Sequence, residues 1–167
     1  MNELIYCQRE IPRGELRYGF RATADTGCGW IATYNALRLM DYRASPGSLI
    51  HFYEWQVPFV HGNIGTMALA PAQFFKIHGY GVESCSLEEK FDEMAKHADV
   101  CILYYRWRKG IKIGAHFVAL QYKDGQFTGY NTYKNSTGPD RYGPSLQEFL
   151  KKQKFFAPVL IAIRDKR

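Results

Sequence analysis

The stretch "DTGCGWIATYNALRLM", residues 25–40, decides the fold prediction. Apolar residues recur at three- and four-residue spacing from Ile31 to Leu39, and large side chains cover much of the remaining helix surface. Arg38 is the only charged residue within this apolar pattern. A helix that is apolar nearly all round is normally buried on most of its faces. The stretch therefore predicts a buried central helix that begins at Cys28.

Cys28 lies between Gly27 and Gly29, where the predicted helix begins. The unpaired N–H groups and the dipole of a helix N-terminus favour a thiolate over a thiol. The flanking glycines let backbone and substrate approach closely. The placement therefore predicts a nucleophile with a lowered pKa. The other cysteines are expected to have packing or incidental roles: Cys7, Cys85 and Cys101.

Length and composition indicate one folded domain spanning residues 1–167. The hydrophobic content of 46% and the aromatic content of 16% argue against disorder. No apolar run approaches the roughly 20 residues needed to cross a bilayer. Residues 1–17 are too charged for a signal peptide. We therefore expect a cytoplasmic protein without a membrane span.

The cysteines and histidines predict no metal site. The four cysteines form no C-x-x-C pair and the five histidines form no H-x-x-x-H pair. Nothing in the sequence points to an organic cofactor either. These observations leave an amino-acid side chain as the expected source of any chemistry, and they do not determine the oligomeric state.

The net charge of +6 raises the question of a nucleic-acid partner. Cations concentrate in "RWRKGIK", residues 106–112, and in the tail from residue 151 onward. Such clusters can bind nucleic acid, but no recognised nucleic-acid motif accompanies them. A solvated basic face is the favoured interpretation, and a nucleic-acid-binding domain is the alternative.

The order of the remaining predicted elements indicates the α+β class. Short helices are predicted near residues 48–57 and 70–79, with Pro71 in a first turn. Two S-x-x-E capping boxes begin helices at Ser86 and Ser145. Strands are predicted over residues 99–107, 114–122, 127–133 and 157–165. Helices thus come first and an antiparallel sheet with an inserted helix follows, which is typical of α+β proteins.

Two apolar runs separated by Asp124 and Gly125 predict a β-hairpin. Around this turn, His116 and Asn131 come within about one step of direct opposition. An imidazole can accept the proton of a thiol, and a neighbouring amide can hold the ring in place. The hairpin alone therefore predicts that a histidine and an asparagine lie close together.

The motifs "GCGWIATYNAL" and "AHFVALQYKDGQFTGYNTY", in the order Cys, His, Asn, resemble those of papain-like cysteine peptidases. The resemblance is strongest to the compact bacterial branch called C39-like, and it spans about residues 20–135. It implies a papain-like α+β fold. In that fold a helical N-terminal half, with a buried central helix, packs on a C-terminal antiparallel β-sheet.

Carried over to this sequence, the resemblance implies Cys28 as nucleophile, His116 as general base and then acid, and Asn131 as the residue that orients the imidazole. It implies hydrolysis of a peptide or a small amide through a thioester acyl-enzyme, without metal or cofactor. Oxyanion donors are expected among Cys28, Thr23 and Arg21. The substrate cleft is expected to include Trp30, Gly29 and Ala115.

One position departs from the family pattern. A glutamine usually lies about six residues before the cysteine and donates to the oxyanion, but here that position is Ala22 and Gln8 lies far upstream. Loss of one oxyanion donor typically lowers the rate by about 10²–10³. Two alternatives to a peptidase stay open. One is an acyltransferase, because the same triad can pass an acyl group to an amine or thiol instead of water. The other is a papain-like binding module with little or no turnover, which the missing glutamine supports.

Overall fold

A computed structural model describes residues 3–56 and 65–166 of the chain. Its centre is a six-stranded sheet in the order β3-β8-β4-β5-β6-β7, in which all neighbours are antiparallel. The strands of this sheet are β3 (Gly81–Cys85), β4 (Val100–Lys109), β5 (Lys112–Lys123), β6 (Gln126–Tyr130), β7 (Asp140–Gly143) and β8 (Phe156–Arg164). A separate pair consists of β1 (Arg17–Tyr18) and β2 (Arg21–Ala22).

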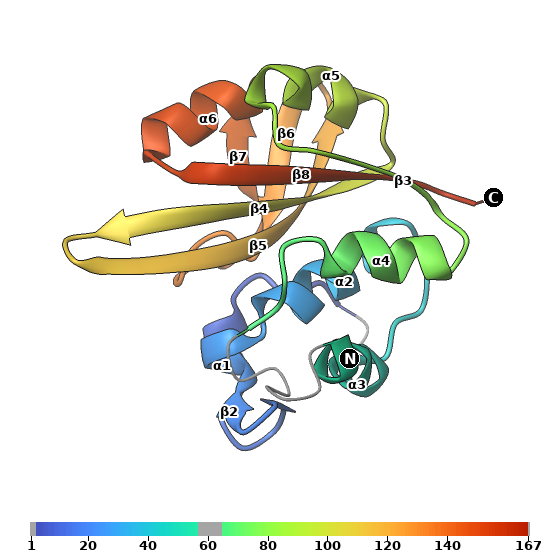
Figure 1. Ribbon diagram of the computed structural model, residues 1–167, viewed down its shortest axis with the longest axis vertical. Helices are drawn as coiled ribbons and strands as arrows, with labels where there is room; N and C mark the ends of the chain where they lie inside the picture. The colour runs from blue at the N-terminus through green and yellow to red at the C-terminus, as the bar shows by residue number, and fades with distance from the viewer. Residues whose placement is uncertain (1–2, 57–64, 167) are drawn as a thin grey trace.

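The helices lie on both faces of this sheet (Figure 1). In chain order they are η1 (Gln8–Glu10), α1 (Thr23–Thr26), α2 (Cys28–Leu39), α3 (Pro46–Gln56), α4 (Ala70–Ile77), η2 (Glu88–Lys90), α5 (Phe91–Lys96) and α6 (Leu146–Gln153). Helices α5 and α6 cover one face, and α2 and α4 lie against the other, with α3 beyond α2. The predicted α+β architecture is confirmed.

Helix α2 is buried along most of its length, as its sequence predicted. Nine of its twelve residues are buried, which is why a nearly all-round apolar sequence is tolerated there. One of its buried polar residues, Asn35, hydrogen-bonds the backbone of Ile5 twice: Oδ1 accepts from the N–H at 2.9 Å and Nδ2 donates to the carbonyl at 2.8 Å. These bonds tie the start of the chain to α2.

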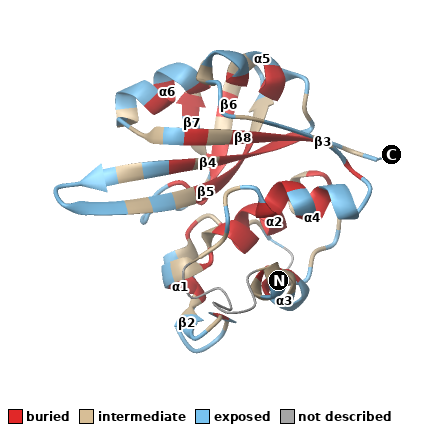
Figure 2. Ribbon diagram, in the orientation of Figure 1, coloured by how far each residue is buried: buried red, intermediate tan, exposed pale blue. Residues whose placement is uncertain are grey.

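Two hydrophobic clusters lie on opposite faces of the sheet, and Figure 2 shows buried residues along α2 and the central strands. Successive side chains of a strand point to opposite faces. On β4, Ile102 belongs to the cluster around α2, whereas Leu103 belongs to the cluster under α5 and α6. Both side chains are fully buried. The sheet therefore separates two cores, and only the first of them contacts the helix that carries Cys28.

Of the two predicted capping boxes, one is confirmed and one is wrong. Ser145 Oγ accepts a hydrogen bond from the Glu148 N–H at 3.3 Å, where α6 begins. Ser86 caps nothing, because the backbone is still extended at Leu87 and the Leu87 N–H bonds to Cys85 Sγ at 3.4 Å. The helix predicted over residues 86–98 is consequently divided into η2 and the short α5.

Two hairpins join the central strands. The predicted turn between β5 and β6 is confirmed, with positive φ at Asp124 and Gly125 and pairing of Lys123 with Gln126. The hairpin between β4 and β5 was not predicted, because both strands continue into the basic stretch until Lys109 pairs with Lys112. That stretch is therefore a paired hairpin and not a loop. No helix of the described residues is long and apolar enough to cross a membrane.

Candidate active site

Cys28 is the first residue of α2, at a junction between two helices. Gly27 links α1 to α2: its N–H donates to the Thr23 carbonyl at 2.8 Å, and its carbonyl accepts from the Ile31 N–H at 3.1 Å. No side chain caps α2 at this end. Backbone groups of Gly29 and Cys28 hydrogen-bond to the Cys28 sulfur. The thiol therefore sits at a helix start whose backbone donors face it.

Burial raises the pKa of Cys28 to about 11, because removal from water disfavours the thiolate. Hydrogen bonds from the backbone of Phe117, Gly29 and Cys28 act in the opposite direction but do not offset burial. The predicted lowering of this pKa is therefore wrong for the structure described. The helix N-terminus alone does not compensate for the loss of solvent, so the resting group is a neutral thiol.

The Cys28 sulfur lies against strand β5 of the sheet. It interacts with the backbone of Phe117, the residue directly after His116. That backbone is accessible because β6 pairs with β5 only from Ala119 onward. The packing of α2 on β5 thus brings the thiol against the strand at the point where the histidine lies. In the described part of the chain, no hydrogen bond joins Cys28 to His116.

The His116 imidazole is held by a main-chain carbonyl. Its Nε2 lies 2.6 Å from the Asn131 carbonyl oxygen. A carbonyl can only accept, so Nε2 carries the proton and Nδ1 carries the lone pair in the neutral ring. Burial lowers the pKa of His116 from its ordinary 6.5, because desolvation disfavours the imidazolium. The ring is thus a neutral base with Nδ1 available.

The hairpin brings Asn131 to His116, as the sequence predicted, but not through the amide side chain. Asn131 follows β6 with φ at 66°, a left-handed conformation that asparagine tolerates better than most residues. Its side chain is turned to Gln8: Oδ1 accepts from the Gln8 N–H at 2.8 Å, and Nδ2 donates to Gln8 Oε1 at 3.2 Å. Asn131 therefore joins His116 to the start of the chain.

Gln8 is the site residue that sequence reasoning missed. Besides its two bonds to Asn131, its Nε2 donates to the Ala24 carbonyl at 3.0 Å, within the helix that leads into Cys28. The chain between Gln8 and α1 makes the small β1–β2 hairpin, which turns at Gly19 with φ at 64°. Sequence separation therefore hides spatial proximity. The turn residues of this segment were the signal that could have revealed it.

The residues expected as further oxyanion donors lie around the same helices. Thr23 begins α1 and is fully buried; among the described residues its hydroxyl has no hydrogen-bond partner. Its methyl group packs close to Gly27. Arg21 lies in β2 and is exposed. Among Thr23, Arg21 and Gln8, the Gln8 amide is the side chain that hydrogen-bonds both to α1 and to Asn131.

The residues expected to line the cleft differ in accessibility. Trp30 is fully buried and stacks edge-to-face on Tyr34 at 6.4 Å, so it supports α2 from inside. Gly29 is covered by Thr66: a Cβ at position 29 would lie 2.1 Å from Thr66 Oγ1. Ala115 is exposed on β5, beside His116. Only Ala115 of the three presents a side chain to solvent.

The described residues include no group of three or more His, Cys, Asp or Glu side chains placed to hold a metal ion. The groups that the arrangement supplies are a half-buried neutral thiol, hydrogen-bonded to the backbone of Phe117, and the neutral imidazole of the preceding residue, His116. Such a pair can transfer a proton at the moment the sulfur attacks an electrophilic carbon.

Comparison with known proteins gives one line of evidence. No family model matches the sequence, and no curated protein matches it. Among solved structures, the chain is similar to the peptidase domain of Streptococcus ComA, a bi-functional ABC transporter involved in a quorum-sensing pathway. The TM-score is 0.53 at 14% identity, covering 81% of this chain and 90% of that one. The similarity shows an α+β fold of the papain-like type.

Proposed function

We propose that residues 1–167 form one cysteine-peptidase domain that hydrolyses a peptide or small amide through Cys28. One observation carries the proposal: the start of α2 packs against β5 next to a histidine whose Nε2 is fixed by the Asn131 carbonyl. A shared fold with a peptidase domain adds support. Hydrolysis is preferred over a binding module without turnover, because Gln8 offers the amide donor that position 22 lacks.

The proposed reaction starts from two neutral groups. As the Cys28 sulfur bonds to the substrate carbonyl carbon, His116 Nδ1 takes the thiol proton. The carbonyl oxygen becomes negative and accepts hydrogen bonds from the Cys28 N–H and the Gln8 amide. His116 then gives its proton to the leaving nitrogen as the C–N bond breaks, which leaves a thioester. Water, deprotonated by His116, releases the acid and restores the thiol.

Turnover of a mixture of internally quenched fluorescent peptides tests the proposal. Cys28→Ala should abolish cleavage, since no other group supplies the nucleophile. Gln8→Ala should lower kcat by about 10²–10³, the usual effect of losing one oxyanion donor. Cys85→Ala is the matched control, because Cys85 is a free, half-buried thiol on the edge strand β3, and it should cleave like the unmodified protein.

Two results would contradict the proposal. Cleavage that persists in Cys28→Ala would exclude the thiol mechanism. Absence of any cleavage, together with absence of a thioester adduct by mass spectrometry of the acid-quenched protein, would leave only a binding role. Added hydroxylamine distinguishes the remaining alternative: if the amine captures most of the acyl group before water does, the chain is an acyltransferase.

A further inference from the structure

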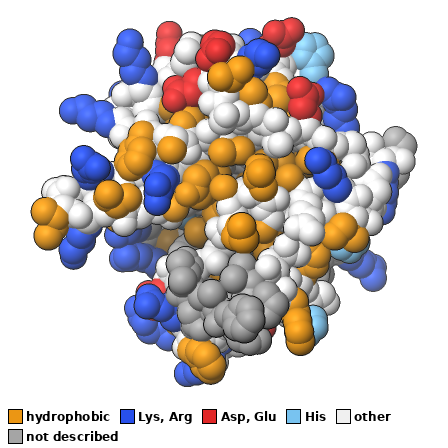
Figure 3. Space-filling view, viewed as in Figure 1, with side chains coloured by type: hydrophobic (Ala, Val, Ile, Leu, Met, Phe, Trp, Pro, Cys, Tyr) orange, Lys and Arg blue, Asp and Glu red, His pale blue; other side chains and the backbone are white. Residues whose placement is uncertain are grey.

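The hairpin formed by the ends of β4 and β5 projects from the sheet beyond the start of α2 (Figure 1). We call residues 106–115 the arm. Its outer part is exposed, and Ile111 at its tip is 100% exposed (Figure 2). The arm carries four cations, Arg106, Arg108, Lys109 and Lys112, and neither β4 nor β5 contains an acidic residue. Lys and Arg side chains gather around this projecting end in Figure 3.

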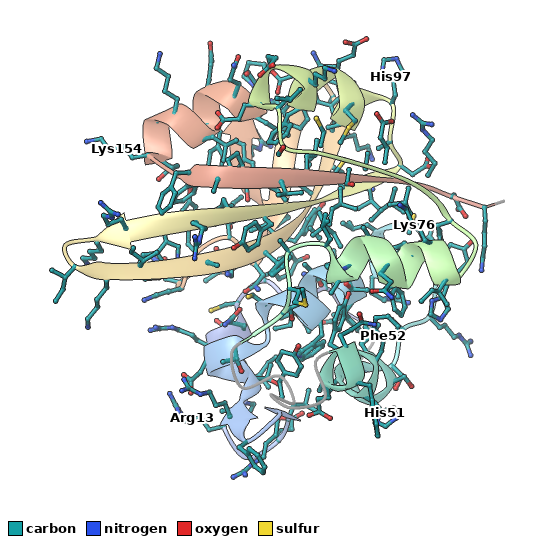
Figure 4. All side chains as sticks on the ribbon, viewed as in Figure 1. Arg13, His51, Phe52, Lys76, His97 and Lys154 are labelled. Carbon is teal, nitrogen blue, oxygen red and sulfur yellow. The ribbon has the colours of Figure 1, made fainter. Side chains whose placement is uncertain are left out.

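The cations of the arm are not neutralised by the protein itself. Within residues 3–56 and 65–166, the ion pairs join Arg13 to Asp25 at 3.0 Å and Arg164 to Glu83 at 3.6 Å. The first pair lies beside α1, where Figure 4 labels Arg13. None of the arm's cations has a hydrogen-bond or ion-pair partner in the described residues. Their charge is therefore available to a ligand.

Strand register assigns these cations to two faces. Tyr104 pairs with Phe117, which packs in the cluster around α2. Because pairing is continuous, Arg106 opposite Ala115 and Arg108 opposite Ile113 lie on that same face. Lys109 and Lys112 pair with each other on the opposite face, to which the pair of Tyr105 and His116 also belongs. The two arginines thus extend, from the thiol outward, the surface on which α2 begins.

Strand pairing in the arm fixes the spacing of its side chains. Trp107 lies over Gly114, where a Cβ would come within 2.2 Å of the indole ring, so ring and backbone are in close contact. Arg106 and Arg108 are two residues apart, a distance of about 6.6 Å along a strand. Alternate side chains of an extended peptide have the same spacing. Two carboxylates separated by one residue would match the two guanidinium groups, which bind carboxylates in bidentate fashion.

We propose that the arm selects acidic substrates: an extended peptide that leaves Cys28 along the arm presents carboxylates at alternate positions to Arg106 and Arg108. The inference rests on the proposed peptidase function and adds the substrate class. The exposed Ile113, which pairs with Arg108 on the same face, offers an apolar contact for the same peptide. The face that adjoins the thiol, and not the arm as a whole, is the recognition surface.

Binding to the Cys28→Ala protein tests the inference without requiring turnover. Fluorescein-labelled ten-residue peptides carry Glu-Gly-Glu, Gln-Gly-Gln or Lys-Gly-Lys, and fluorescence anisotropy gives each Kd at 20 mM and 500 mM NaCl. The Glu peptide should bind about 5- to 20-fold more tightly than the Gln peptide at low salt, the effect of two exposed charge pairs. The preference should largely vanish at high salt.

Two double variants on this background separate the faces of the arm. Arg106→Glu with Arg108→Glu should reverse the preference, so that the Lys peptide binds more tightly than the Glu peptide. Lys109→Glu with Lys112→Glu makes the same change in net charge on the opposite face and should keep most of the preference for Glu. Circular dichroism and urea unfolding of both variants check that the arm change leaves the fold intact.

Four results would overturn the inference. The first two are equal Kd values for the Glu and Gln peptides, and no measurable binding of the Glu peptide up to 1 mM. The third is an equal loss of the preference for the Glu peptide in the two double variants. The fourth is tighter binding of a single-stranded oligonucleotide or of phosphatidylserine vesicles than of the Glu peptide. A preference for Glu without peptide cleavage by the unmodified protein would reject the peptidase and keep the acidic-peptide surface. Peptide cleavage without a preference for the Glu peptide would keep the peptidase and reject the acidic-peptide surface.

Discussion

At the scale of single residues, the site depends on one asparagine that is used twice. The main chain of Asn131 holds the His116 ring, while its side chain holds Gln8. The left-handed backbone at Asn131 aims the carbonyl at the imidazole. Backbone conformation at this position therefore matters as much as the side chain that the sequence singled out.

Two substitutions of Asn131 separate these uses. Glycine accepts a φ of 66° without strain, whereas alanine in that region costs about 1–2 kcal/mol. Both variants lose the bonds to Gln8, but Asn131→Gly keeps the carbonyl in place. We expect Asn131→Gly to retain several-fold more kcat than Asn131→Ala and to unfold at higher urea concentration. Equal losses in both would mean that the side chain, not the carbonyl, orients His116.

The neutral thiol predicts how Cys28 reacts with iodoacetamide. With a pKa of about 11, only about one thiol in ten thousand is ionised at pH 7. Labelling of the folded protein should therefore rise steadily with pH up to about 11, and at neutral pH it should be slower than in urea. Peptide mapping by mass spectrometry measures the rate at Cys28. A plateau near neutral pH would indicate a preformed thiolate–imidazolium pair instead.

The fall of kcat/KM at low pH should follow protonation of His116. In the proposed reaction the neutral imidazole is the base. Burial lowers its pKa below 6.5, so the ring stays neutral in more acidic solution than a free histidine does. The kcat/KM for a cleaved peptide should therefore hold as pH falls through 6.5 and decline only below it. A midpoint at or above 6.5 would contradict the burial of the ring.

At the scale of elements, Thr66 fastens the start of α2. It covers Gly29, and its Oγ1 lies 3.1 Å from the Tyr18 hydroxyl in β1. The segment after residue 64 thus connects the small hairpin to the helix that bears the thiol. Gly29 is required because no side chain fits between the helix and this segment.

Gly29→Ala tests that contact. The new Cβ would overlap Thr66 and should destabilise the fold by about 1–3 kcal/mol, a typical cost of overpacking. In the double variant with Thr66→Gly, the overlap disappears and much of the loss should be recovered. Urea unfolding of the four proteins gives the coupling free energy. Additive losses would show that Gly29 is not held by Thr66.

The elements that the sequence predicted correctly are those with strong local patterns. Helix α2 and the turn at Asp124 and Gly125 have strong periodicity or turn chemistry, and both were predicted correctly. The edge strands β3 and β7 are short and have little burial to mark them. Gln8 escaped because its contact with Asn131 joins residues 123 positions apart, which no local pattern reports. The half-buried environment of Cys28 escaped for the same reason.

At the scale of the whole molecule, the sheet divides the interior into a cluster around α2 and a cluster under α5 and α6. Only the first cluster touches the helix with Cys28. Cys28 packs against the first cluster, whereas the His116 ring lies 5.9 Å from the ring of Tyr105, a member of the second cluster. Packing of the helix that bears the thiol therefore depends mainly on the first core, and the imidazole contacts the second.

Neighbouring positions on β4 test this asymmetry. Ile102→Ala and Leu103→Ala each remove a fully buried side chain and should cost about 2–5 kcal/mol. Ile102→Ala should also speed the labelling of Cys28 under native conditions, because it loosens the cluster under α2. Leu103→Ala should leave that rate nearly unchanged at equal stability loss. If both variants speed labelling alike, the two clusters respond as one.

The bond between Gln8 and Asn131 also sets an order on biosynthesis. The ribosome synthesises Cys28 early and synthesises Asn131, whose carbonyl holds the His116 ring, much later, directly after β6. Under the proposed function, a growing polypeptide that has reached only β5 lacks the carbonyl that holds His116. Catalysis would then have to wait until the ribosomal tunnel has released Asn131.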